Sequence, residues 1–300
     1  MPELPEVQTI VNDLNQKVTG YLIEDFWSDW HKAMNIPYLE FAKKIKGKII
    51  EEVERKGKYL IFYLSEKLVM IVHLKMTGHL LVKDLSAASK DSKIALENQD
   101  YFSDRVNQYI HHIWRLKHKS KKDSDIISLE FSDLRKFGKI KLISKTQLAT
   151  EKSLTKIALD PFDKSFTREY FKELLHSKKE RNIRTILMDQ EIIPGIGNIY
   201  VSEILFDCGI SPKRKVGLIS EQEQSALYFS IRKILKKAID LRGTSDSDYR
   251  DTAGAPGSFQ KFLKVYNREG AACQRNGCKG IVKREKMNQR SAYYCQLCQI

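Results

Sequence analysis

The chain has 300 residues, of which 42% are hydrophobic and 10% aromatic, enough to bury a core in two domains of ordinary size. Its 52 Lys and Arg against 38 Asp and Glu give a net charge of +14, which indicates a polyanionic partner, with nucleic acid ahead of a membrane surface. No apolar run reaches the roughly 18 residues of a transmembrane helix, and the first residues lack a secretory signal, so we expect a cytoplasmic protein with no membrane association.

A predicted helix follows directly on the opening residues, MPELPEV. Pro5 suits the first turn of that helix. Removal of Met1 would leave Pro2 with a secondary amine whose pKa, about 7.7–8.0 for an α-amino group, keeps a fraction neutral and nucleophilic. Glu3 and Glu6 are either helix-capping acids or proton-transfer groups beside that amine, and the residues alone favour capping.

The rest of the first half is predicted to be mainly β-structure. Six runs are apolar or alternating and are bounded by turn residues: 20–27, 47–57, 58–64, 67–74, 109–118 and 125–143. The last two are read as two strands joined by the polar turn KSKKDS. The polar stretch from about 84 to 107 is expected to be a loop insertion.

From about residue 150 the pattern becomes helical. Four runs have helical spacing: 167–179, 182–190, 198–209 and 221–241. The third begins at Asn198, a good N-cap, after the glycines of the turn PGIGN. That turn is either a phosphate site at a helix start or a packing turn between helices. A polar, Gly-rich loop, 242–258, follows the last helix.

Four of the five cysteines lie near the C-terminus with the spacing C-x4-C-x16-C-x2-C. In a reducing compartment such a group is typical of a metal site, and two thiolate pairs a hairpin apart suit a closed Zn²⁺ site. The predicted ligands are Cys273, Cys278, Cys295 and Cys298. The cations between the two pairs suit either phosphate contact or solubility: Lys279, Lys283, Arg284, Lys286 and Arg290.

Taken together, these motifs resemble those of bacterial formamidopyrimidine-DNA glycosylases, base-excision repair enzymes for oxidised purines. MPELPEV matches the N-terminal signature, ERKGKYL a hairpin motif, and HLKMTG and DLRKFG two strand motifs. LMDQEIIPGIGNIYVSEILFDCGISP matches a helix–two-turn–helix. The resemblance covers nearly the whole chain except the insertion.

The resemblance implies an α+β fold in three parts. Residues 1–148 would form a catalytic β-sandwich with a leading helix, and 149–241 a helical domain with the helix–two-turn–helix. Residues 242–300 would form a lesion-recognition loop and a zinc finger. A monomer with one structural Zn²⁺ and no other cofactor would bind damaged double-stranded DNA in a cleft between the domains.

The resemblance also implies residue roles. Pro2 would attack C1′ of the damaged nucleotide, Glu3 would act as general acid/base, and Glu6 would support them. Lys58 would contact phosphate and assist proton transfer. Glycosidic bond hydrolysis would be followed by strand cleavage through β- and δ-elimination.

Further implied roles concern the DNA. Met76, Arg135 and Phe137 would fill the gap left by the everted nucleotide, with Arg135 facing the orphaned cytosine. The residues that would hold phosphates are Lys136, Asn198 and Arg290. Without the resemblance, Met76 and Phe137 would be core residues and Lys58 and Arg135 solvated cations. His73 would be a packed residue, a surface residue or a phosphate contact.

The 242–258 loop departs from the family pattern. It is unusually acidic, and Ser247 stands where many members carry a basic residue. This departure bears on recognition of 8-oxoguanine more than on the chemistry. Two other functions compete: an oxidised-pyrimidine glycosylase of the endonuclease VIII type, against which the L-P-E-V start argues, and a non-catalytic zinc-finger DNA-binding protein, against which Pro2, Glu3 and Lys58 argue.

Overall fold

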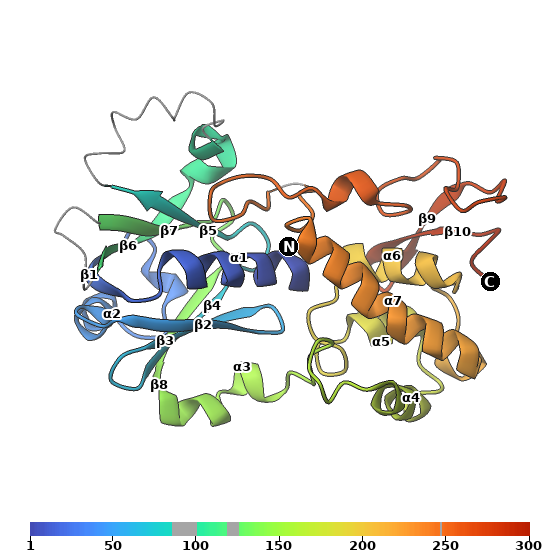
Figure 1. The fold of residues 1–300 in the computed structure, drawn as a ribbon, viewed down its shortest axis with the longest axis horizontal. Helices are drawn as coiled ribbons and strands as arrows, with labels where there is room; N and C mark the ends of the chain where they lie inside the picture. The colour runs from blue at the N-terminus through green and yellow to red at the C-terminus, as the bar shows by residue number, and fades with distance from the viewer. Residues whose placement is uncertain (86–100, 119–125, 247) are drawn as a thin grey trace. The chain divides into compact units, whose positions relative to one another are not determined.

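The computed structural model describes residues 1–85, 101–118, 126–246 and 248–300, and the chain forms two compact units (Figure 1). The first unit is Met1–Thr155 with Arg242–Ser258, and the second is Lys156–Leu241 with Phe259–Ile300. The predicted turn KSKKDS, Ser247 and most of the predicted insertion lie outside the described residues. Within the described ranges, no helix is long and apolar enough to cross a membrane.

The compact units do not follow the order of the sequence. The 242–258 loop belongs to the first unit, although the chain on both sides of it belongs to the second. The division into 1–148, 149–241 and 242–300 stays a prediction, and it differs from the compact units chiefly in its treatment of this loop.

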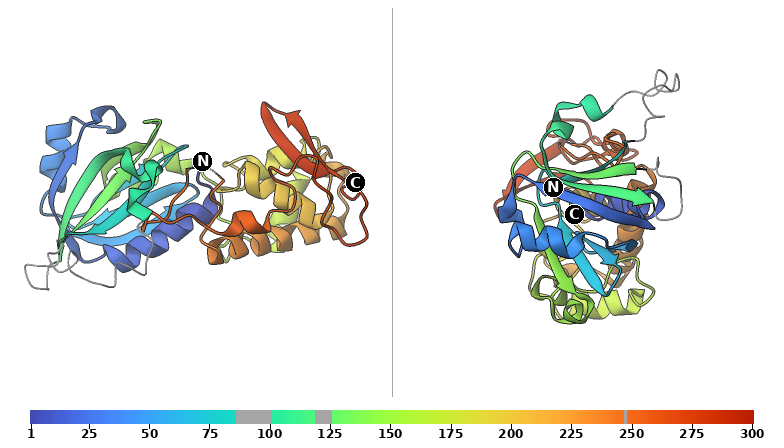
Figure 2. Two further views of the ribbon diagram at one scale, coloured as in Figure 1. Left: turned by 90° about the horizontal axis from the view of Figure 1, so that it is seen from above. Right: turned by 90° about the vertical axis from the view of Figure 1, so that its left-hand side faces the viewer.

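The first unit is built from two four-stranded antiparallel sheets, as the predicted β-sandwich requires. One sheet has the order β1-β6-β7-β5, with bounds Tyr21–Ser28, Ile110–His118, Ile126–Ser132 and His79–Asp84. The other has the order β2-β3-β4-β8, with bounds Ile50–Lys56, Tyr59–Leu64, Leu68–His73 and Lys139–Ser144. The strands can be followed in two further views (Figure 2).

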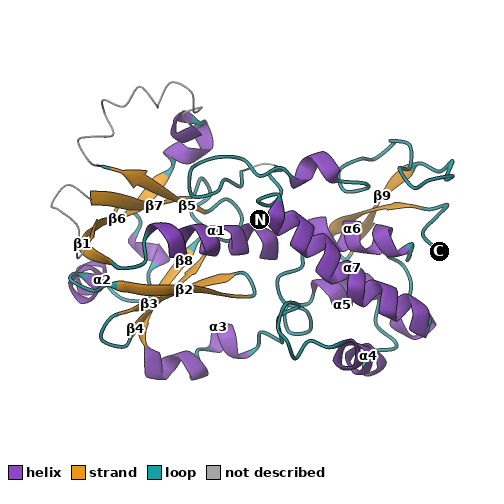
Figure 3. Ribbon diagram, viewed as in Figure 1, coloured by secondary structure: helices purple, strands orange, loops and turns teal. Residues whose placement is uncertain are grey.

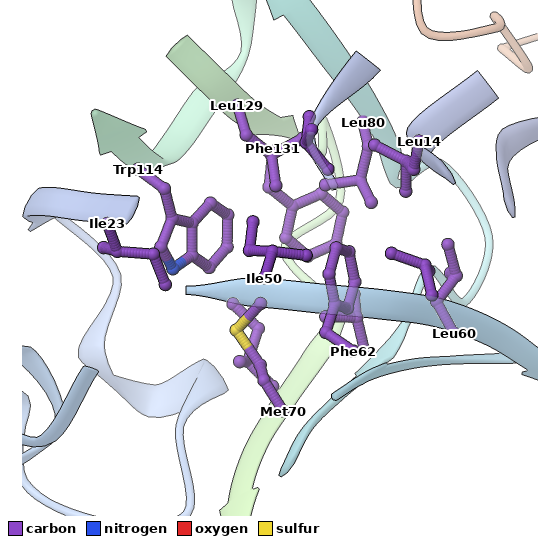
Figure 4. Packing of buried hydrophobic residues seen from close by; sticks show 14 of the residues in the cluster. Leu14, Ile23, Ile50, Leu60, Phe62, Met70, Leu80, Trp114, Leu129 and Phe131 are labelled. Carbon is purple, nitrogen blue, oxygen red and sulfur yellow. The ribbon is translucent and has the colours of Figure 1, made fainter. Parts of the chain in front are cut away.

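The core of the first unit lies between the two sheets. Phe131 and Trp114 of one sheet and Phe62 and Met70 of the other are almost fully buried, and Leu14 joins them from α1 (Leu4–Lys17) (Figure 4). Helix α1 packs against β2 and β3. Burial of each such side chain contributes about 1.5–3 kcal/mol, so this core fixes α1, and the residues preceding it, on the sandwich.

Three local predictions for the first unit were wrong or incomplete. Run 125–143 is two strands, β7 and β8, which belong to different sheets. Helix α2 (Tyr38–Ile45) was not predicted, because it is only 8 residues long and buries little more than Phe41 and Ile45. Strand β5 was also not predicted. The described part of the expected insertion holds two short 3-10 helices, η4 (Tyr101–Ser103) and η5 (Arg105–Gln108).

The second unit is helical with a two-stranded sheet (Figure 3). The four predicted helices are confirmed as α4 (Arg168–His176), α5 (Ile183–Met188), α6 (Asn198–Cys208) and α7 (Glu221–Asp240). The predicted hairpin between the cysteine pairs is β9 (Val282–Met287) and β10 (Arg290–Cys295). A single turn of helix, α3 (Lys152–Thr155), ends the first part of the first unit.

A histidine is buried in the aromatic part of the sandwich core. His112 on β6 is fully buried and stacks on Phe26 and Phe131, and neither ring nitrogen has a hydrogen-bond partner among the described residues. Burial, and then the charge of His111, lowers the pKa of His112 to about 3. In the unfolded chain His112 therefore binds a proton near the ordinary histidine pKa of about 6.5, whereas in the folded chain it stays neutral at that pH.

His112→Phe should make the first unit less sensitive to acid. The free energy of unfolding is unaffected by the titration of His112 above about pH 6.5. It decreases as the pH falls towards 3, and the decrease is about 2 kcal/mol at pH 5. The variant should therefore gain stability over the wild type at pH 5 relative to pH 7.5. Urea unfolding followed by the fluorescence of the three tryptophans, all in the first unit, measures this difference.

The matched control is His118→Phe at the half-buried end of the same strand. Equal behaviour of the two variants between pH 7.5 and 5 would contradict the assignment of this acid sensitivity to His112.

Candidate active site and nucleic-acid contacts

The residues that begin α1 are buried and held by one carboxylate. Pro2, Glu3 and Glu6 are buried, whereas Met1 is 43% exposed. Glu6 Oε2 accepts a 2.7 Å hydrogen bond from the backbone N–H of Glu3, which is the capping contact predicted for this turn. Pro5 lies in the first helical turn, as predicted. The peptide carrying Pro2 therefore has a fixed conformation at the helix start.

The other oxygen of Glu6 contacts the 242–258 loop. Glu6 Oε1 accepts a 2.7 Å hydrogen bond from the backbone N–H of Thr244. The Tyr249 hydroxyl lies 3.5 Å from the carbonyl oxygen of Glu6, to which it donates. Gly243, with φ +82°, is required here because a Cβ atom would lie 2.8 Å from Glu6 Oε1. Glu6 thus joins the predicted nucleophile's peptide to a segment distant in sequence.

Lys58 lies in the tight turn between β2 and β3 and is only 6% exposed. The reading of Lys58 as a solvated cation is therefore wrong. Arg55 positions this turn, because its Nε donates to Gln8 Oε1 on α1 at 2.8 Å and its Nη1 to the Gly57 carbonyl at 3.1 Å. The sequence analysis missed Arg55, although it stands within the ERKGKYL motif.

His73, at the end of β4, is a packed residue. Its ring makes an edge contact with Tyr59, with centroids 4.4 Å apart, and its Nδ1 accepts a hydrogen bond from the Lys75 backbone N–H at 2.9 Å. Burial, and then the charges of Lys75 and Lys58, lowers the pKa of His73 to about 3. The ring of half-buried His73 is therefore neutral and packed on Tyr59, and its contact with phosphate stays a prediction.

The structure brings together three of the predicted DNA-contacting residues. Met76 and Phe137 are 43% and 45% exposed, so the alternative reading of both as core residues is wrong. Arg135 Nη1 lies 3.2 Å from Met76 Sδ, and its guanidinium lies 4.7 Å from the centre of the Phe137 ring. Lys136 beside them is exposed and adopts φ +54°. Exposed apolar side chains gathered around a cation suit contact with unstacked bases.

A buried aspartate beneath these side chains shapes the turn that carries them. Asp133 is 1% exposed, and its Oδ2 accepts hydrogen bonds from the backbone N–H groups of Phe137 at 2.9 Å and Gly138 at 2.8 Å. Its Oδ1 accepts from the Thr77 hydroxyl, which in turn accepts from the Arg135 N–H. Sequence reasoning missed Asp133, although Asp at the start of a turn is a usual signal.

In the second unit, Asn198 is the first residue of α6, and Gly197 is the N-cap, so the predicted capping role of Asn198 is wrong. Its side chain instead accepts a hydrogen bond from Arg184, which is 2% exposed. Arg184 also donates to the carbonyl oxygens of Met287, at 3.3 Å, and Ser291, at 3.2 Å. Arg184 therefore connects the predicted phosphate contact to the hairpin.

The hairpin presents its basic side chains to solvent. Arg290 begins β10 and is exposed, and burial followed by the charge of Arg290 lowers the pKa of the Arg184 guanidinium. The other basic residues between the cysteine pairs, which suit either phosphate contact or solubility, are also exposed: Lys279, Lys283, Arg284 and Lys286. The glycines of the PGIGN turn are buried, and Gly195 donates its N–H to Gln190 Oε1 at 2.9 Å.

The four predicted cysteine ligands lie together. Their Sγ atoms are all within 4.8 Å of one another, with 3.6 Å between Cys273 and Cys298 and 3.7 Å between Cys278 and Cys295. Four sulfurs about 2.3 Å from a central ion at tetrahedral angles lie about 3.8 Å apart, so this group can hold a metal ion.

The backbone also supports thiolates at this site. The N–H groups of Arg275 and Gly280 donate to Cys273 Sγ and Cys278 Sγ at 3.4 and 3.3 Å. Burial raises the pKa of Cys273 and, to about 12, that of Cys298. Burial also opposes ionisation of Cys295, but hydrogen bonds from the backbone N–H groups of Cys298 and Leu297 and from the thiols of Cys273 and Cys298 together outweigh it and lower the pKa of Cys295 to about 7. Thiolates are the form in which cysteines bind metals.

Two family models match the sequence. The formamidopyrimidine-DNA glycosylase N-terminal domain matches residues 1–140, and the formamidopyrimidine-DNA glycosylase H2TH domain matches residues 157–249. The formamidopyrimidine-DNA glycosylase of Carboxydothermus hydrogenoformans is 38% identical over 302 residues, covering 100% of both chains. That of Pelotomaculum thermopropionicum is 37% identical over 300 residues, covering 100% of this chain and 99% of the relative.

Solved structures of the same family also resemble this chain. A complex of Lactococcus lactis Fpg with DNA containing an abasic site superposes with a TM-score of 0.82, at 29% identity over 99% of both chains. A complex of the wild-type Lactococcus lactis enzyme with DNA containing an oxidised pyrimidine superposes with a TM-score of 0.81, again at 29% identity over 99% of both chains.

Asp133→Ala should destabilise the first unit by about 3 kcal/mol, because it leaves buried backbone and hydroxyl donors without an acceptor. Tryptophan fluorescence in urea measures this loss. Asp25→Ala, at an exposed position on β1, is the control and should change stability by no more than about 0.5 kcal/mol. An equally small effect of both substitutions would mean that Asp133 does not organise the turn.

Proposed function

The chain belongs to the formamidopyrimidine-DNA glycosylase family, and from this premise we propose that it excises oxidised purines from duplex DNA in base excision repair. The observation that carries the proposal is the buried start of α1, where Glu6 accepts a 2.7 Å hydrogen bond from the Glu3 N–H, in the peptide that joins Pro2 and Glu3, and a second one of 2.7 Å from the Thr244 N–H. A nucleophile with a fixed orientation loses little entropy when it reacts.

The proposed chemistry begins at Pro2. After removal of Met1, the neutral secondary amine attacks C1′, the glycosidic bond breaks, and the base leaves with a proton. The resulting iminium allows loss of a C2′ proton and the 3′ phosphate by β-elimination, then of the 5′ phosphate by δ-elimination. Glu3, 3% exposed beside the amine, supplies and removes protons during ring opening and elimination, and Glu6 orients both residues.

Lys58 assists from the turn between β2 and β3. Its burial and the contacts of Arg55 with Gln8 and Gly57 support a fixed cation near the start of α1, since that turn is tied to the helix. We assign to Lys58 contact with phosphate and help in proton transfer.

The exposed Met76–Arg135–Phe137 group is proposed to occupy the space left by the everted nucleotide, with Arg135 facing the orphaned cytosine. Lys136 is proposed to contact phosphate as a point charge. In the second unit, the contact of Arg184 with Asn198 and the hairpin supports joint phosphate binding by Asn198 and Arg290. Such contacts hold the DNA in position rather than read its sequence.

Zinc is the metal proposed for the four cysteines, because four thiolates at tetrahedral spacing form a closed structural Zn²⁺ site. Bound zinc would stabilise the segment that carries Arg290. No reacting group of the proposed chemistry depends on it. An enzyme that acts on chromosomal DNA is expected in the compartment that holds the DNA, which in a bacterium is the cytoplasm.

Oxidised pyrimidines form the second substrate class to be tested, since one of the similar complexes contains an oxidised-pyrimidine DNA. A panel of duplexes carrying 8-oxoguanine, formamidopyrimidine, 5-hydroxycytosine or thymine glycol should show preference for the two purine lesions. Preference for the pyrimidine lesions would replace the proposed specificity and leave the amine chemistry in place.

Borohydride should cross-link the mature protein to a duplex with an abasic site, because it reduces the imine formed by Pro2. The same chain with Met1 retained, verified by mass, should give no cross-link, since Pro2 is then an amide. Glu3→Gln should slow excision of 8-oxoguanine by about 100-fold or more. The exposed Glu51→Gln serves as control. A mature protein that binds the duplex without cross-linking would be a DNA-binding protein and not a glycosylase/lyase.

One zinc ion per chain is expected by elemental analysis, and Cys298→Ala should lose it together with most DNA affinity. The control is Cys208→Ala, which removes a thiol whose pKa burial raises to about 11, outside the cluster. Loss of metal from the Cys208 variant, or another metal in the wild type, would contradict the assignment.

A further inference from the structure

The 242–258 loop is held on the first unit from two sides. The first side is α1. The Arg242 guanidinium donates to Asp13 at 2.6 and 3.2 Å and from Nε to Asp251 at 2.8 Å, and the Thr252 hydroxyl donates to Asp13 at 2.8 Å. With the Glu6–Thr244 contact, these bonds hold Arg242, Thr244 and Thr252 of the loop against α1.

The second side is the segment 101–108, the described end of the predicted insertion. Arg250 donates to Asp104 Oδ2 from Nη2 at 2.7 Å and from Nε at 3.0 Å, and Arg250 is largely buried. Both bonds end on one carboxylate oxygen, and hydrogen bonds between charged groups are stronger than neutral ones.

Asn107 makes the second contact on this side. Its side chain is fully buried, and its amide donates to the carbonyl oxygens of Tyr101 at 2.7 Å and Gly254 at 3.1 Å. Its Oδ1 lies 2.8 Å from His79 Nε2 on β5. Gly254 has φ +78°, and a Cβ there would lie 2.7 Å from Asn107 Nδ2. The side chain of Asn107 therefore packs closely against the backbone of Gly254, which leaves no room for a larger residue at position 254.

Segment 101–108 is not required to complete either sheet. Its 3-10 helices add no strand, yet two of its residues bond directly to the loop, and the backbone N–H of Val82 on β5 donates to the Thr252 carbonyl at 2.8 Å. The contacts on this side thus hold Arg250, Thr252 and Gly254, whereas α1 holds Thr244 through Glu6 and both Arg242 and Thr252 through Asp13.

We propose that Asp104 and Asn107 are positioning residues that set the position of the 242–258 loop beside the N-terminal amine and thereby determine how well a damaged base is accepted. The proposal rests on the proposed function. It assigns to the end of the predicted insertion the role of holding the loop. It also separates two properties: chemistry at C1′ depends on α1, and acceptance of the base depends on both sides of the loop.

The test compares two reactions of the full-length mature protein. Borohydride cross-linking to an abasic-site duplex requires no base, whereas single-turnover excision of 8-oxoguanine does. Asp104→Asn removes the ion pair and keeps the shape, and Asn107→Leu keeps the branching of the side chain and removes the hydrogen bonds. Each variant should excise roughly tenfold more slowly, with cross-linking within about twofold of the wild type.

Asp104→Glu should recover part of the excision rate, because it restores the charge. The matched control is Glu151→Gln, which removes an ion-paired and more deeply buried carboxylate that bonds to Lys141 and Ser153 outside the loop. It should change neither reaction. If Asn107→Leu fails to fold, Asp104→Asn decides the question.

The proposal would be overturned if Asp104→Asn left the ratio of excision rate to cross-linking rate unchanged, either because neither reaction slowed or because both slowed equally. Failure of the wild type to cross-link would overturn the proposed function itself, which keeps the two failures distinguishable.

Discussion

The arrangement of the candidate site depends on one buried carboxylate. Glu6 is 1% exposed, and each of its oxygens accepts a backbone hydrogen bond, from Glu3 on one side and from Thr244 on the other. A buried charge without partners would be costly, whereas hydrogen bonds to a charged group are worth about 1.5–3 kcal/mol each. The carboxylate that caps α1 therefore fixes both the peptide of Pro2, the proposed nucleophile, and the Thr244 end of the 242–258 loop.

Two other buried charged groups organise irregular segments in the same way. Asp133 satisfies the backbone of the turn below Arg135, and Arg184 satisfies carbonyl groups of the C-terminal hairpin and contacts Asn198. In each case a buried polar group fixes the conformation of the backbone through hydrogen bonds. Neighbouring side chains can therefore face solvent. Exposed side chains can then have a defined orientation without being part of a core.

Prediction from the sequence succeeded where the signal was local and periodic. The α-helices of the second unit and the cysteine spacing are of this kind, and the motif residues Met76, Arg135 and Phe137 do gather. It failed at Asn198, where a helix start was placed correctly but the cap is the preceding glycine.

It also failed where long-range contacts decide. Thr244 lies 238 residues from Glu6, and Gly254 lies 147 residues from Asn107, so no local pattern reveals either bond. Run 125–143 was read as one strand, and only the distant pairing partners divide it, because β7 pairs with β5 and β6 whereas β8 pairs with β4 of the other sheet.

The discontinuity of the first unit has a consequence during synthesis. Residues up to Thr155 can form both sheets and their core soon after they leave the ribosome, but the loop that completes the unit ends at Ser258. At about 5–20 residues per second, that interval lasts roughly 5–20 s. During this time Glu6 Oε1 and Asp13 lack their loop partners and remain hydrated. The nascent chain therefore carries a folded sandwich without its loop, and docking of the 242–258 loop on α1 is among the last events of folding.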